Sequence, residues 1–588
     1  MMREMDDQPG WAFRTWLLLA VGAAAGLIVH LLTEGAPAEP PGSLRLALAT
    51  FIGTAAATIG FTLERGRWLS TLIFALVAGL VVSSVIYWNG GPDDWDAANG
   101  WRLLCAAITV AIAAPLFQAW REGQVGALQW RSALPYAAVH DHAWTNVVLW
   151  VLAWAFCGIV LLLCYLLSEL FQLIGIDLLR DAMREEWFMA ILIGGSLGCG
   201  VGLMRDRERI LATLQRVGMT VLSVLAPVLG AGLLLFVLAL PFTGLEPLWD
   251  ATRATTPILL STVVAAILLI NAVIGDSPED EAKLPALRWG AMALGVTILP
   301  LAVIAAVSTG LRIGQYGLTP DRLWAVVFTA IATAYGIAYV VSLLRGRAGW
   351  AVPLRRANLM LAFGLCGVAF LLSTPLLSFG ALSTRDQIAR LQDGRTPPER
   401  FDWAALWFDF GPAGKRAVRE LAQSSANAEI RKRAKEIQQA KYRWDASELT
   451  NRQIAAETLD RRLTILPVPV PVPQALRDRL AHSDMCGSSQ SCVLLYRPGE
   501  DSAVLIATPC DTCDPTIRPV YARDGKWEER QGGGPAMVWT PDAVKEGYPS
   551  AAEREAVKTA IDQGKVEIRP VERRQLFIDG KPAGQPFE

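Results

Sequence analysis

The sequence carries little charge for its length. Charged residues make up 19% of its 588 residues, whereas soluble domains contain about 25%, and hydrophobic residues make up 53%. The net charge is −1, so there is no basic surplus to neutralise phosphates, and nucleic acid is not an expected partner. The composition also excludes a collagen, a disordered chain and a lone disulfide-rich knot.

The shortage of charge is confined to the first part of the chain. Of residues 1–380, 48 are charged, about 13%, whereas 61 of residues 381–588 are charged, about 29%. The first part therefore cannot be an ordinary soluble domain, and the second part resembles one. We expect a transmembrane helical domain over residues 1–380, a helical extension over 381–463, and a small soluble α+β module over 464–588.

A helix that crosses the hydrocarbon of a bilayer needs about 20 mostly apolar residues, because its backbone polar groups must bond within the helix. The first part contains eleven such stretches and predicts an all-α polytopic bundle. They are Thr15–Leu32, Leu44–Leu63, Trp68–Trp88, Leu103–Trp120, Asn146–Leu167, Trp187–Met204, Met219–Leu240, Pro257–Ile274, Trp289–Thr309, Leu323–Leu344 and Asn358–Phe379.

Lysine and arginine in the short loops predict the orientation, because cytoplasmic loops carry an excess of both. With the N-terminus inside, sixteen fall on the cytoplasmic side and seven on the other. An odd number of spans then places the C-terminal module outside. A cleaved signal peptide is the competing interpretation of Trp16–Leu32 and Ala36-Pro37-Ala38, but Glu4, Asp6 and Asp7 make the preceding segment hardly positive.

Nine cysteines divide into two groups. Five lie inside predicted spans, where cysteine serves as a small apolar residue. The others, Cys486, Cys492, Cys510 and Cys513, fall within 28 residues of the module and predict two disulfides in an oxidising compartment. A zinc site or a redox pair is the alternative, but C-x5-C is wider than the usual zinc spacing, and Asp514-Pro515 replaces the helix of a redox motif.

The C-terminal part contains several local signals. Gly411-Pro412 predicts a break, and Gly414–Arg443 predicts one charged helix. The alternating prolines of Ile465–Pro473 predict a polyproline strip or an edge strand. Cys492–Arg497 and Ser502–Thr508 predict a hairpin, and short helices are expected around Pro541–Glu546 and Ala551–Asp562.

Ionisable groups are scarce inside the spans, which disfavours a proton-coupled pump. Tyr335, Tyr339 and Ser342 share one helical face and either line a cavity or form interhelical hydrogen bonds. Prolines interrupt the predicted spans at four places, Pro300 and Pro375 among them, yet no repeat of two matching halves is evident.

Two loops on the predicted outer side contain candidate functional residues. Asp93, Asp94 and Asp96 are candidates for cation binding or for the base of a transferase, although outer loops are commonly acidic. In the second loop, Thr319, Pro320 and Asp321 are explained as the start of a helix. That start does not explain Arg312, Tyr316 and Arg322, which together with Asp321 are candidates for an anion or lipid-headgroup site.

The segment Tyr316–Arg322, Tyr-Gly-Leu-Thr-Pro-Asp-Arg, resembles the hallmark of a bacterial multi-span family known only as domain of unknown function 4153. Leu170–Ile176 is similar to a second element of that family. Ser383–Gln387 with Phe401-Asp402-Trp403 resembles the start of the extension that its members carry. The resemblance implies an integral inner-membrane protein, and it supplies no activity, catalytic residue or cofactor.

The leading hypothesis is a protein of the bacterial inner membrane, with a cytoplasmic N-terminus, that presents a disulfide-stabilised module to the periplasm. It would act by binding, in envelope sensing or assembly, with an envelope protein or a lipid as ligand. The main alternative is a transporter or channel for a neutral or lipid-like substrate, and the third is an extracytoplasmic transferase. No cofactor and no metal are predicted, and the bilayer is the one certain partner.

Overall fold

A computed structural model describes most of the chain. The described residues are 11, 13–34, 42–91, 95, 97–123, 134–244, 255–445, 459–481, 483–486, 492–507, 516–523, 525–529, 551–566, 574–578 and 581–587. They form two compact units, residues 1–435 and residues 436–588. The first unit contains the membrane domain and the second contains the module.

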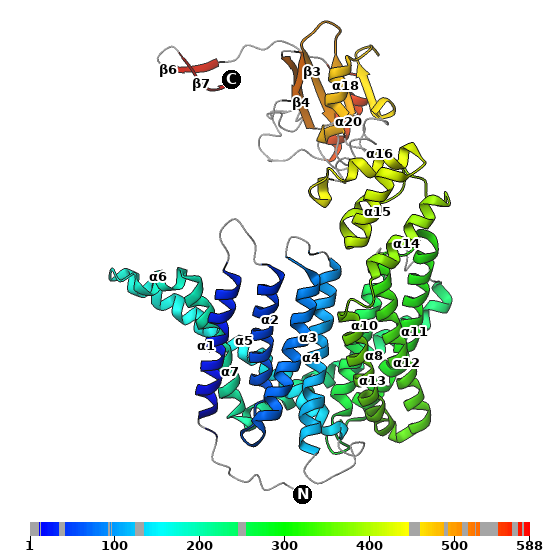
Figure 1. Ribbon diagram of the computed structural model, residues 1–588. Helices are drawn as coiled ribbons and strands as arrows, with labels where there is room; N and C mark the ends of the chain where they lie inside the picture. Colours follow the sequence, from blue (N-terminus) through cyan, green and yellow to red (C-terminus); the bar gives the residue numbers. More distant parts are fainter. Residues whose placement is uncertain are drawn as a thin grey trace. The chain divides into compact units, whose positions relative to one another are not determined.

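Eleven helices of the described residues are long and apolar enough to span a membrane, which confirms the predicted bundle (Figure 1). Each corresponds to one predicted stretch. They are α1 (Phe13–Thr33), α2 (Ser43–Thr62), α3 (Trp68–Asn89), α4 (Ala97–Gly123), α5 (Tyr136–Leu173), α7 (Glu186–Arg205), α8 (Glu208–Thr243), α10 (Thr255–Ile274), α11 (Pro285–Tyr316), α12 (Pro320–Gly346) and α13 (Ala351–Ser373). A short helix, α6 (Leu178–Arg184), joins α5 to α7.

Two sequence predictions about helix ends are wrong. The last span ends at Ser373 rather than Phe379, and Pro375 lies in the turn that follows it. A new helix, α14 (Phe379–Gln392), begins there, because the Ser378 side chain accepts a hydrogen bond from the Ala381 amide at 3.2 Å. The proline, which lacks an N–H, therefore separates a span from a surface helix.

The predicted charged helix over Gly414–Arg443 is two helices, α15 (Gly411–Ser424) and α16 (Ala428–Ile437). Asn427 caps the second, since its side-chain oxygen accepts from the Glu429 amide at 2.9 Å. The break predicted at Gly411-Pro412 is present, since a helical segment ends at Asp409 and α15 begins at Gly411, which has a φ of +64°. Pro412 suits the first turn of α15. The prediction of a single helix took account of the charged residues but not of the cap at Asn427.

Helices α8, α10, α11, α12 and α13, the group drawn in green, contribute residues to one apolar core (Figure 1). Ile270 of α10, Leu294 and Ile298 of α11, and Leu354 of α13 have no exposed surface. Trp350, just before α13, is 1% exposed. Because α11 contributes buried residues along most of its length, it forms the centre of this half of the bundle.

In the other half, α1 and α7 pack through glycine at backbone distance. A Cβ built on Gly194 would lie 2.2 Å from the Gly22 carbonyl oxygen, and one built on Gly26 would lie 2.1 Å from the Ala190 carbonyl oxygen. The two helices run antiparallel, and Gly198 opposes Leu18 in the same register. Small residues four apart allow this close approach, which is a common basis of helix association in lipid.

The ends of the α1–α7 pair are joined by charged and polar side chains. Arg14 forms an ion pair with Asp206 at 2.7 Å, and the Thr15 hydroxyl donates to the same carboxylate at 2.8 Å. At the opposite end, His30 Nδ1 lies 4.0 Å from Glu186 Oε2. These contacts fix the register that the glycines permit.

The module contains a five-stranded sheet of order β1-β2-β3-β4-β5. Its strands are β1 (Leu463–Leu466), β2 (Cys492–Tyr496), β3 (Ser502–Ala507), β4 (Thr516–Arg523) and β5 (Lys526–Glu529). Strands β1 and β2 are parallel and the other neighbours are antiparallel, so the predicted hairpin is confirmed as β2–β3. The alternating prolines follow β1, an edge strand, and lie outside it.

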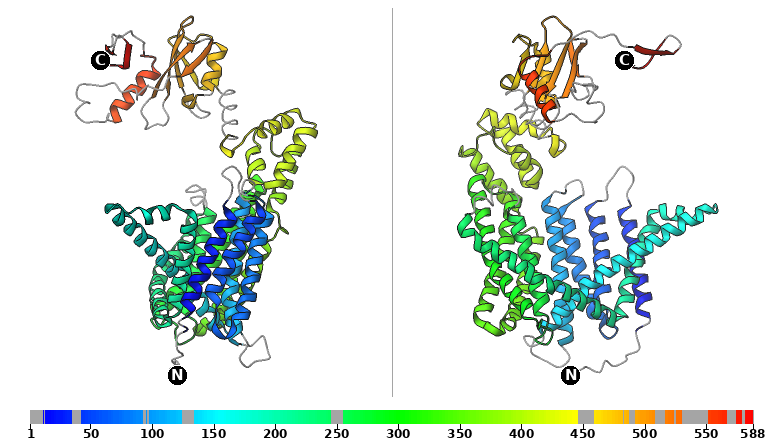
Figure 2. Two further views of the ribbon diagram at one scale, coloured as in Figure 1. Left: turned by 60° about the vertical axis from the view of Figure 1, so that its left-hand side comes forward. Right: turned by 180° about the vertical axis from the view of Figure 1, so that it is seen from behind.

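Helices cover both faces of this sheet (Figure 2). α18 (Gln474–Ala481) packs Leu476 against Leu494 and Leu505, whereas α20 (Ala551–Asp562) packs Ile561 against Leu495 and Ile506. The alternation of side chains along β2 and β3 explains why both faces are apolar. A second sheet pairs β6 (Arg574–Ile578) with β7 (Lys581–Phe587), and the helix expected around Pro541–Glu546 lies outside the described residues.

The glycine packing predicts that Gly194→Ala destabilises the membrane domain by about 1–3 kcal/mol, because a methyl group there forces two backbones apart. Gly158→Ala on α5 is the matched control, since a Cβ on Gly158 meets no atom within 4 Å. Thermal denaturation of the two variants in detergent measures the difference. Equal midpoints for the two variants would show that the close approach does not matter for stability.

Candidate functional site

The turn between α11 and α12 takes only three residues, Gly317 to Thr319. Gly317 has a φ of +78°, a left-handed conformation that glycine adopts without steric cost. The Thr319 side chain accepts from the Arg322 amide at 3.4 Å, and Pro320 occupies the first turn of α12. The expected helix start is therefore present, and the chain reverses between two spans without a long loop.

Helix α14 holds this turn through polar side chains. Asp386 Oδ2 accepts a hydrogen bond from the Leu318 amide at 2.7 Å. Gln387 Nε2 donates to the carbonyl oxygens of Tyr316 and Leu318 at 2.9 and 3.0 Å. A Cβ on Gly317 would lie 2.6 Å from Asp386 Oδ2 and Gln387 Nε2, so a larger residue would displace the side chains that hold the turn.

Arg390, one turn further along α14, caps the end of α11. Its Nη2 donates to the carbonyl oxygens of Ile313 and Gly314 at 3.1 and 3.3 Å, and its Nε lies 3.3 Å from Asp386 Oδ2. The last carbonyls of a helix lack partners within the helix, and the helix dipole makes that end negative. A planar cation with several donors suits both conditions. We call Asp386, Gln387 and Arg390 the α14 clasp.

The predicted binding residues gather at the same turn. Arg322 donates to the Gly317 carbonyl oxygen at 2.6 Å, and its guanidinium lies 5.5 Å from the centre of the Tyr316 ring, which is 63% exposed. Arg312 lies close enough for its charge to repel that of Arg322, and Asp321 is exposed beside them. Arg322 thus holds the turn while presenting a cationic and aromatic surface with its neighbours.

Tyr339 belongs to a buried hydrogen-bond network. Its hydroxyl accepts from Asn271 Nδ2 at 3.2 Å. The Asn271 side-chain oxygen accepts from Asn358 Nδ2 at 2.8 Å and from the Tyr136 hydroxyl at 3.2 Å. Tyr335 contacts Tyr339 edge-on, with ring centres 6.0 Å apart. Tyr339 has no exposed surface, so these contacts fit the interhelical interpretation of the tyrosine pair.

Arginine caps like that of Arg390 recur through the membrane domain. Arg355 is 6% exposed and donates to the carbonyl oxygen of Ile274, the last residue of α10, and to that of Ser277 in the loop that follows. Other arginines donate to the final carbonyls of a neighbouring helix in the same way: Arg14 to Arg205 of α7, Arg67 to Arg121 of α4, Arg121 to Thr62 of α2, Arg205 to Gly60 of α2, and Arg45 to Leu31 of α1.

Sequence reasoning missed the role of Arg390. One feature of the sequence could have indicated it. Asp386 and Arg390 are four residues apart on a helix that follows the last span, a spacing that brings opposite charges together. Asn358 and Tyr136 gave no comparable signal, because their partner lies on a different helix and only the packing of the bundle brings them together.

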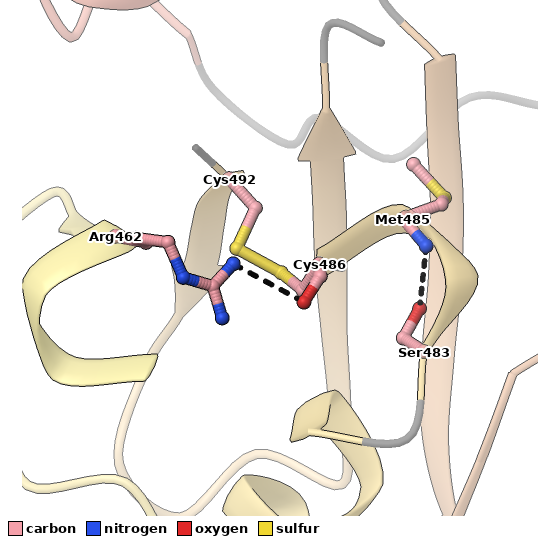
Figure 3. Close-up of a disulfide and its surroundings, with 5 residues drawn as sticks. All are labelled: Arg462, Ser483, Met485, Cys486 and Cys492. Atoms are coloured by element: carbon pink, nitrogen blue, oxygen red, sulfur yellow. Dashed lines mark hydrogen bonds between the residues drawn. A yellow bond between two sulfur atoms is a disulfide. The ribbon is translucent and has the colours of Figure 1, made fainter. Parts of the chain in front are cut away.

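In the described part of the module, a disulfide joins Cys486 to Cys492, whose Cα atoms are 5.7 Å apart (Figure 3). Both residues are buried, and Arg462 donates to the Cys486 carbonyl oxygen at 3.3 Å. A disulfide uses both thiols, so these two cysteines are not zinc ligands in this structure. Cys510 and Cys513 lie outside the described residues.

The acidic loop candidates Asp93, Asp94 and Asp96 also lie outside the described residues. Across the ranges that the structure describes, no group of three or more His, Cys, Asp or Glu side chains is arranged to hold a metal ion.

Comparison with known families matches residues 46–408 to a domain of unknown function, DUF4153. The match includes the α11–α12 turn and the α14 clasp. Comparison with curated proteins and with solved structures finds no match. The matched residues make up more than half of the chain, which confirms the resemblance seen in the Tyr316–Arg322 segment: the chain belongs to the DUF4153 family.

Proposed function

We propose that the chain is a bacterial inner-membrane protein with a cytoplasmic N-terminus and a periplasmic module, and that it acts by binding, in envelope sensing or assembly. Sixteen of the 23 lysines and arginines of residues 1–380 fall on the side assigned to the cytoplasm. Eleven spans then carry residues 381–588 to the opposite side.

The buried disulfide is the observation that carries this proposal. Disulfides form and persist in oxidising compartments such as the periplasm and are rare in the cytosol. Cys486 and Cys492 are 0% and 2% exposed and pack within the apolar core beneath the sheet, so the bond belongs to the interior of the module. Loop charge and cysteine chemistry support the same compartment by independent arguments.

The α14 clasp supports sensing in particular. α14 follows the last span and precedes the module in the chain, and it binds the α11–α12 turn through Asp386, Gln387 and Arg390. A displacement of α14 would therefore strain hydrogen bonds to the ends of two spans at once. A contact of this kind could transmit a conformational change from the module to the membrane helices when the module binds a ligand.

The other hypotheses have less support. Transport rests on Tyr335 and Tyr339, and the hydroxyl of Tyr339 is bonded to Asn271 inside the bundle. A transferase rests on Asp93 and Asp94, for which no geometry is described. Binding therefore remains the function that the described residues favour.

The proposed orientation predicts that alkaline phosphatase fused after Glu588 is active, because this reporter folds only in an oxidising compartment, and that a fluorescent protein fused there stays dark. The same two reporters placed in the α10–α11 loop should give the opposite pair of results. Phosphatase that is silent after Glu588 would reverse the proposed topology.

The proposed binding role predicts that a strain lacking this protein grows poorly under envelope stress, such as detergent in the medium, and that the wild-type chain restores growth. Cys486→Ser combined with Cys492→Ser should fail to restore it, because opening so short a loop costs the module about 2 kcal/mol. Cys157→Ser, at a buried position in α5, is the control and should restore growth.

The same growth assay separates the hypotheses. Asp93→Asn combined with Asp94→Asn should leave complementation intact if the protein acts by binding. Loss of complementation in that variant, together with full activity of the double serine variant, would overturn the proposal in favour of a transferase.

A further inference from the structure

A cavity of about 420 Å³ lies within the membrane domain, between α1, α2, α5 and α7. Small residues such as Gly53 and Ala57 of α2 form one wall, and Trp150 and Trp154 of α5 form another. The lining is almost wholly apolar. We propose that this cavity binds one hydrocarbon chain of a bilayer phospholipid.

The position and size of the cavity identify its occupant. All of its lining residues belong to helices that can span the membrane, so it opens to hydrocarbon rather than to water. Along α1 it extends from Leu18 to Val29, about 16 Å by helical rise and roughly half the thickness of the bilayer core. A helix of a second protein copy would need roughly three times the volume over that length.

The two tryptophans give a second indication. Their side chains are 57% and 49% exposed, and their rings meet edge-on with centres 6.3 Å apart. Within the part of the chain that the structure describes, neither indole N–H has a hydrogen-bond acceptor. An indole N–H favours the headgroup depth of a bilayer, where lipid oxygen atoms can accept its hydrogen bond. A phospholipid supplies oxygen acceptors as well as the chain, whereas a plain hydrocarbon supplies only the chain.

This inference does not depend on the proposed function, because the cavity lies in the membrane domain and the proposal there concerns the module. It also differs from ordinary contact with surrounding lipid. Exposed apolar side chains cover the outside of the bundle, Met360 and Phe370 of α13 among them, whereas the cavity is lined from four helices at once.

The test uses the full chain in nanodiscs that contain phosphatidylethanolamine with a photoreactive diazirine on one acyl chain. Gly53→Leu should fill the cavity without a backbone clash, because a Cβ there meets no atom within 4 Å. The leucine side chain should displace two or more methylene groups of the bound acyl chain. The weaker binding should lower cross-linking of the lipid to α2 and α5 about tenfold. Gly367→Leu, on α13, is the control with equal free space and should cross-link as the wild type does.

A second variant keeps the proposal open to refutation if Gly53→Leu folds poorly. Trp154→Phe retains the apolar surface and removes one donor, and it should lower the retention of lipid measured by native mass spectrometry. Uniform cross-linking over all lipid-facing helices of the wild type would overturn the proposal. Disulfide-linked dimers of a Gly53→Cys variant would also overturn it, because they would place a second copy at the cavity.

Discussion

A helix that ends in or near hydrocarbon leaves its last carbonyl oxygens without donors, and the membrane domain depends on the way these oxygens are satisfied. The helix dipole adds negative charge to the same end, so a cationic donor suits it. Here the donors are arginines from neighbouring helices. Arg355 donates to the last carbonyl of α10, Arg121 to the last carbonyl of α2, and Arg390 to carbonyls in the last turn of α11. Each cap stabilises one helix end and fixes the position of another helix against it.

These caps give the arginines a structural role in addition to their use as indicators of orientation. Their distribution between loops indicates orientation, and several of them are also structural ties between helices that are distant in the sequence. Arg121 is 3% exposed and contacts Glu64 as well as Thr62. A buried charge of this kind persists only where several acceptors surround it. The glycine contact of α1 with α7 plays the complementary part, since it brings the two backbones together between the polar contacts at the ends of the pair.

The sequence predicts local features of this protein well. Each span follows from an unbroken apolar run, and the β2–β3 hairpin follows from alternation around a turn. The end of α13 was misplaced because Leu376 to Phe379 continue the apolar run past the proline that ends the helix. Residues Gly414–Arg443 were predicted as one helix because charged residues occur on both sides of Asn427, and the capping role of Asn427 was not recognised among them.

The candidate site was predictable only in part. Tyr316 and Arg322 lie near each other in the chain, so their proximity was foreseeable. The hydrogen bonds of Tyr316 and Leu318 with Asp386 and Gln387 join residues about 70 positions apart. The partners of Asn271 come from three other helices. Such contacts depend on how helices pack, and no periodicity along one helix reveals them.

Replacing arginine by lysine at two sets of positions tests the central role of the caps most directly. Lysine keeps the charge and removes the planar set of donors. Thermal denaturation in detergent should show losses of about 1.5–3 kcal/mol for Arg121→Lys, Arg355→Lys and Arg390→Lys. The exposed arginines Arg216, Arg356 and Arg385 should tolerate the same change without loss. Equal midpoints in the two sets would contradict this account, because charge alone would then suffice at the helix ends.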